Sequence, residues 1–117
     1  MQRVFLPLTM VACVLTTVVP VGAADTVTGE VIEVECHIKL GANGTGEGHA
    51  ECALKCARGG GELGILTAFG VYTITGEMTE NNNAKLLDFV AKNVEVTGEV
   101  TEGHGDYWIE VASIAVK

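Results

Sequence analysis

The chain has 117 residues, 48% of them hydrophobic, and its 15 acidic and 7 basic residues give a net charge of −8 at neutral pH. A chain of this length accommodates a single domain. Its acidity argues against nucleic acids and anionic membrane surfaces as partners, because both are bound through basic surfaces. An acidic surface suits cationic partners, including metal ions.

Residues 1–24 contain the three parts of a secretory signal peptide. Arg3 gives a positive start, residues 4–19 form an apolar run interrupted only by threonines and one proline, and Ala23 and Ala24 supply small residues for a peptidase. The run is shorter than the roughly 20 residues of a membrane-spanning helix, which favours cleavage over an anchor. A lipoprotein signal at Cys13 is the other alternative, although the apolar run continues past it. We expect a periplasmic or secreted domain of residues 25–117, without stable membrane insertion after cleavage.

The mature chain predicts five short strands and two short helices. In chain order, we expect a strand over 26–36, a glycine-rich loop over 39–48, a helix over 48–58, strands over 65–68 and 71–75, a helix over 84–92, and strands over 94–101 and 107–116. Glycines 59–61 end the first helix, asparagines 81–83 cap the second, and the last two strands form a hairpin.

Five short strands with a helix before the closing hairpin predict a mainly β fold, a small OB-like barrel. An α+β ferredoxin-like sandwich is the structural alternative. The pentapeptide VTGEV occurs twice, at 27–31 and 96–100. We interpret it as a recurring strand pattern rather than as an internal duplication.

Two stretches of the chain carry a resemblance to known proteins. The segments KNVEVTGEVTEG and YWIEVASI resemble the closing strands of bacterial OB-fold proteins. The mature chain as a whole resembles an uncharacterised family of small bacterial periplasmic OB-fold-like proteins that contain GEVI, then a cysteine, then HAECA followed by a third cysteine, and then G-x-L-T. The resemblance implies the fold and the compartment, and it implies no specific chemistry because OB folds serve many functions.

Removal of the signal peptide leaves three cysteines, Cys36, Cys52 and Cys56, in an oxidising compartment. An odd number there indicates a free thiol, an intermolecular bridge or a ligand. His49, Cys52 and Cys56 recur at helical spacing and share one face of the predicted helix. The glycine-rich loop allows Cys36 to fold back over that face. The resulting Cys₃His set suits copper(I) or zinc(II), with His37 as a replacement ligand.

The Cys-x₃-Cys spacing with a histidine resembles the ligand sets of Sco-type copper chaperones and of the binuclear copper site of cytochrome oxidase. The likeness covers this short stretch and concerns ligand chemistry alone. We expect an extracytoplasmic protein that binds or delivers copper or zinc rather than an enzyme. Two alternatives stay open. In the first, a disulfide from Cys36 to Cys52 or Cys56 stabilises a structural or interaction domain, or an accessory subunit of an exported complex. In the second, Cys52 supports thiol redox chemistry.

Overall fold

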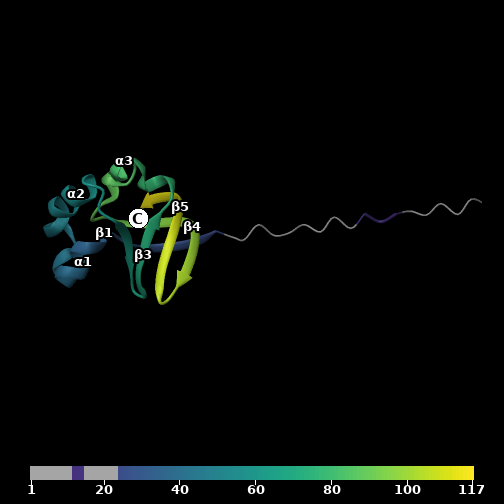
Figure 1. Ribbon diagram of the computed structural model, residues 1–117, viewed down its shortest axis with the longest axis horizontal. Coiled ribbons are helices and arrows are strands. Elements are labelled where there is room, and N and C mark those ends of the chain that lie inside the picture. The colour runs from purple at the N-terminus through teal and green to yellow at the C-terminus, as the bar shows by residue number, and fades with distance from the viewer. Residues whose placement is uncertain (1–11, 15–23) are drawn as a thin grey trace, which may run out of the picture.

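The computed structural model describes residues 12–14 and 24–117 of the chain (Figure 1). The predicted signal peptide lies almost entirely outside the described residues. Within the part that is described, no helix is long and apolar enough to cross a membrane.

The described residues contain five strands, which form one sheet that closes on itself. They are β1 (Asp25–Glu33), β2 (Leu63–Thr67), β3 (Gly70–Thr75), β4 (Asn93–Gly103) and β5 (Asp106–Val116). Hydrogen bonding runs around a closed barrel in the order β1-β2-β3-β5-β4, and β4 pairs again with β1. All neighbouring strands are antiparallel except β3 and β5, which are parallel. The prediction of a mainly β fold is confirmed, and the closed order differs from the open sheet of a sandwich.

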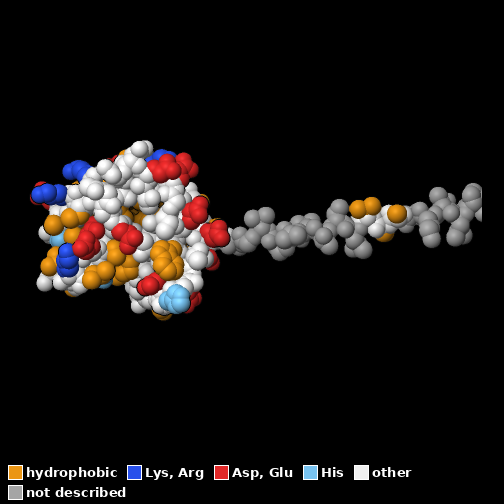
Figure 2. Space-filling view, in the orientation of Figure 1, with side chains coloured by type: hydrophobic (Ala, Val, Ile, Leu, Met, Phe, Trp, Pro, Cys, Tyr) orange, Lys and Arg blue, Asp and Glu red, His pale blue; other side chains and the backbone are white. Residues whose placement is uncertain are grey.

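Alternation of side chains along the strands fills the barrel interior. Val94 and Val96 on β4 are fully buried, while Glu95 between them is exposed, as expected for residues of a strand that point to opposite faces. Val31, Ile65 and other fully buried side chains complete the same core. Acidic side chains are spread over the outer face that Figure 2 shows. Apart from the buried Glu33, the acidic residues therefore lie on or near the surface of the described domain, and apolar residues of the strands form the core.

β1 closes the barrel by pairing with two strands in succession. Its first part, up to Glu30, pairs with β4, and its last part, from Glu30, pairs with β2. Gly29 lies so close to the carbonyl oxygen of Leu66 that a side chain would have no room. Gly98 meets the carbonyl oxygen of Glu110 in the same way, at the point where the register between β4 and β5 shifts. Both copies of VTGEV thus place a glycine where two backbones approach closely.

Within residues 24–117, three short helices accompany the sheet, rather than the two expected. They are α1 (Val34–Leu40), α2 (Ala50–Arg58) and α3 (Glu80–Asn83). α1, α2 and two 3₁₀ turns between them (Gly41–Gly44 and Glu47–His49) belong to residues 34–62, which we call the β1–β2 insert. Figure 1 shows α1 and α2 together at one end of the barrel.

Two predicted boundaries require correction. The first strand ends at Glu33 instead of residue 36, because the chain turns there into α1. The helix expected over 84–92 is wrong, since this stretch forms only a 3₁₀ turn at Leu87–Phe89. The backbone around residue 91 pairs instead with β1: Ala91 N donates to Val31 O at 2.8 Å, and Val31 N donates to Lys92 O at 3.0 Å. This pairing is incompatible with a continuous helix.

Candidate metal centre

Cys36 is held in the first turn of α1 by the residue that ends β1. Glu33 caps α1, and its Oε2 accepts a hydrogen bond of 2.7 Å from the backbone N–H of Cys36. A carboxylate is a favourable cap because the first N–H groups of a helix have no partner within it. The Glu33 side chain is therefore buried at the start of the β1–β2 insert, with the residue only 2% exposed. Glu33 and Cys36 are thus fixed relative to each other.

The second half of the centre comes from α2. His49 immediately precedes α2, and Cys52 and Cys56 follow within it, which confirms the predicted helix as their scaffold. The chain leading to His49 is tied to the barrel, because Gly46 N donates to both carboxylate oxygens of Glu30, at 2.9 and 3.2 Å. This contact holds the segment that precedes α2 against β1, the strand that continues into α1. The glycine-rich loop therefore brings Cys36 and the cysteines of α2 together, as its position in the sequence suggested.

The potential ligands form two groups that share one sulfur. The first group is Cys36, His49 and Cys52, and the second is Glu33, Cys36 and Cys56. Within each group the ligand atoms lie within 4.8 Å of one another. The Sγ atoms of Cys36 and Cys56 are 4.0 Å apart. This separation is close to the roughly 3.8 Å expected between two sulfurs that each lie 2.3 Å from a tetrahedral zinc ion.

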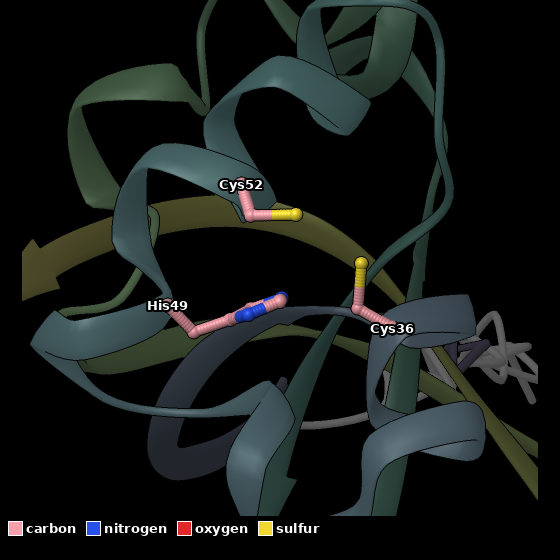
Figure 3. Close-up of side chains that lie close together, drawn as sticks. All are labelled: Cys36, His49 and Cys52. Atoms are coloured by element: carbon pink, nitrogen blue, oxygen red, sulfur yellow. The ribbon is translucent and has the colours of Figure 1, made fainter.

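In the first group, the imidazole and both thiols point into a common space (Figure 3). His49 is only 8% exposed, and its Nε2 atom is buried without a hydrogen-bond partner among the described residues. A buried polar atom without a partner is costly and rare in folded proteins. A metal ion between the two sulfurs and Nε2 would satisfy this atom, while Cys52 remains exposed to solvent.

Glu33 strongly affects the charge state of the shared thiol. The pKa of Cys36 is raised to about 12, mainly because its thiol hydrogen-bonds the Glu33 carboxylate, and further because of burial and the neighbouring Cys56. The unliganded thiol is therefore protonated at neutral pH. A negative carboxylate beside it favours the approach of a cation, which can take the place of the thiol proton.

A surface pocket of about 390 Å³ opens onto the second group. Cys36 and Cys56 line it together with Glu33, and Lys39 and Glu35 on its rim form an exposed ion pair of 2.8 Å. The two thiols are therefore reachable by a small molecule or by a side chain of another protein. A larger hollow of about 830 Å³ lies between the segments that flank α3, at Met78 and Lys85, and strands β4 and β5, and it has no cysteine or histidine in its lining.

His37, expected as a replacement ligand, belongs to neither group of described residues. It lines a different pocket of about 440 Å³, together with Phe69 and Trp108. Consecutive residues on a helix point in directions about 100° apart, so His37 faces away when Cys36 faces α2. The other four predicted ligands lie in the two groups around Cys36.

Glu33 is the one member of the centre that the sequence did not indicate. Acidic residues that alternate with apolar ones along a strand are expected on its solvent face, whereas Glu33 is buried as the cap of α1. A signal was available in its position, three residues before a cysteine at the end of a strand. A side chain that caps a helix commonly accepts a hydrogen bond from the backbone N–H two or three residues later, which is the spacing between Glu33 and Cys36.

Comparisons with protein families, with curated proteins and with solved structures found no match for this chain. The function is therefore argued from the chemistry of the centre.

Proposed function

We propose that the protein is an extracytoplasmic carrier of one soft metal ion, copper(I) or zinc(II), held by Cys36, His49 and Cys52. The observation that carries the proposal is the buried Nε2 of His49, which has no hydrogen-bond partner in the part of the chain that the structure describes and points toward two thiols (Figure 3). Thiolate and imidazole donors select copper(I) and zinc over calcium or magnesium, which prefer oxygen ligands.

Cys56 is the candidate for a fourth ligand. Structural zinc sites are almost always four-coordinate, and the Cys56 sulfur lies 4.0 Å from that of Cys36. An exposed Cys52 and a pocket beside Cys56 leave the bound ion near the surface. This accessibility supports binding and delivery rather than a closed structural site.

The proposed fold is an OB-type barrel. The closed order β1-β2-β3-β5-β4, with β3 parallel to β5, supports it, as does the short helical segment between β3 and β4. Proteins of this fold bind ligands on the face of strands 2 and 3 and at the loops after strands 1 and 4. The β1–β2 insert is one of these loops, and it carries all the proposed ligands.

Metal content of the exported protein tests the proposal. We expect protein purified anaerobically from the periplasm to begin near Asp25 and to contain about one zinc or copper ion per chain, measured by elemental analysis and intact mass. His49→Ala should lower the content at least about tenfold, because three donors become two.

His104→Asn is the matched control. His104 lies exposed in the β4–β5 turn with a φ of 53°, which asparagine also tolerates, so this variant should keep the full metal content. Metal-free protein from cells supplied with both metals, or equal contents in the two histidine variants, would contradict the proposal.

A further inference from the structure

We infer that Cys36 and Cys56 form a reversible disulfide and that this disulfide and the bound metal exclude each other. The inference deepens the proposed function, because the exclusion of metal depends on the proposed metal site. It adds the chemistry by which the metal would be released, when the disulfide forms, and bound again, when the disulfide is reduced. Three features of the described residues carry it: the sulfur separation, the packing of α1, and the access to both thiols.

The two sulfurs are close enough to bond after a small movement. They are 4.0 Å apart, and a disulfide bond measures about 2.05 Å. Cys56 lies in the last turn of α2, where its carbonyl oxygen accepts hydrogen bonds from Gly59 and Gly61 at 3.1 and 2.9 Å. α1, in contrast, contains no fully buried residue. The Cys36 sulfur can therefore move by about 2 Å, through rotation of its side chain and a small displacement of α1, with little loss of buried apolar contact.

An oxidant can reach this pair of thiols directly. Both cysteines line the surface pocket of about 390 Å³, whose rim includes the half-exposed Leu40. The reacting class is a disulfide, RSSR, either small or carried by another protein. One thiol attacks RSSR, which forms a mixed disulfide and releases RSH, and the second thiol then displaces the other RSH. Two protons and two electrons leave the cysteines and appear in two molecules of RSH.

Oxidation would dismantle both ligand groups at once, because they share Cys36. After the sulfur of Cys36 has bonded to that of Cys56, the first group retains only His49 and Cys52. The second group retains only the Glu33 carboxylate. Neither remainder offers the three or four protein donors of a zinc site. In the opposite direction, a metal ion on Cys36 occupies the sulfur that the disulfide needs.

The test uses the chain from Asp25 onward, which contains all the described helices and strands. The reduced, metal-free protein is treated with oxidised glutathione, and peptide mapping follows the products. We expect a Cys36–Cys56 linked peptide, a loss of about 2 Da, and a Cys52 that still reacts with an alkylating agent. Oxidation should weaken zinc binding at least about 100-fold, and prior zinc loading should slow disulfide formation at least about tenfold.

Two variants provide the controls. Cys52→Ser should still form the disulfide when metal-free, whereas Cys56→Ser should not. A Cys36–Cys52 bridge as the main product, or an oxidised protein that binds zinc as tightly as the reduced one, would overturn the inference and leave the proposed function intact. A reduced protein that forms the disulfide but never binds zinc or copper would overturn the proposed function and the exclusion, and would leave only the cysteine pairing.

Discussion

Replacing Cys36 with serine is expected to abolish metal binding. Cys36 is the only residue that the two ligand groups share, so the substitution removes one donor from each. A hydroxyl is a poor ligand for copper(I) or zinc compared with a thiolate. Loss of an outer-shell partner already costs 10–100-fold in metal affinity, and loss of this ligand should cost more than about 100-fold. Competition with a chromophoric chelator measures the affinity directly.

Two further serine variants locate the ion. If it lies in the first group, Cys52→Ser should weaken binding nearly as much as Cys36→Ser, and Cys56→Ser should weaken it less. If Cys56→Ser instead weakens binding more than Cys52→Ser does, the ion lies beside Glu33 and Cys56. A Cys36→Ser protein that binds within about threefold of the wild type would refute the ligand assignment, provided that its circular dichroism spectrum shows the native fold.

Gly98→Ala should be among the most destabilising single substitutions in the barrel. The added Cβ would collide with the carbonyl oxygen of Glu110 on the neighbouring strand, and a backbone atom in a paired strand cannot move aside as a flexible side chain can. Overpacking costs about 1–3 kcal/mol and occasionally more, and we expect the upper end, about 3 kcal/mol, from urea unfolding of the metal-free protein. Gly29→Ala should behave alike, since its Cβ would meet the carbonyl oxygen of Leu66.

Gly103→Ala is the matched control on the same strand. A Cβ at Gly103 would lie 3.4 and 3.8 Å from ring atoms of Trp108, which is ordinary contact. The free energy of unfolding should therefore change by no more than about 0.5 kcal/mol. Similar effects of Gly98→Ala and Gly103→Ala would show that the close approach of β4 and β5 does not constrain the barrel.

The strands could be predicted because burial on one face imposes period-two alternation. Val94, Val96 and Ile109 are fully buried at such positions. The hairpin of β4 and β5 could be predicted as well, because two strand patterns flank the short Gly103-His104-Gly105 sequence. The helix expected over 84–92 failed for a non-local reason. Leu86 is buried as an amphipathic helix would require, but the backbone that follows it bonds to Val31 on β1. A local pattern contains no information about that distant partner.

The sequence predicted which cysteines and histidine lie in the candidate site better than it predicted how they are grouped. Clustering of Cys36, His49, Cys52 and Cys56 indicated a common site, and α2 forms where the sequence placed a helix. The second group was not foreseen, because the first strand was expected to continue to residue 36 and Glu33 was not among the predicted ligands. Glu33 ends β1 and caps α1 instead of continuing the strand. This depends on the direction in which the chain leaves β1 for the β1–β2 insert, which the sequence pattern does not specify.

X-ray absorption spectroscopy of the zinc-loaded protein tests the central claim most directly, because it reports the atoms bound to the metal. A bound ion should show a mixed first shell, with sulfur at about 2.3 Å and imidazole nitrogen at about 2.0–2.1 Å. His49→Ala should remove the imidazole signal, and His104→Asn should leave it unchanged. A first shell of oxygen and nitrogen alone, without sulfur, would contradict a metal centre built around Cys36.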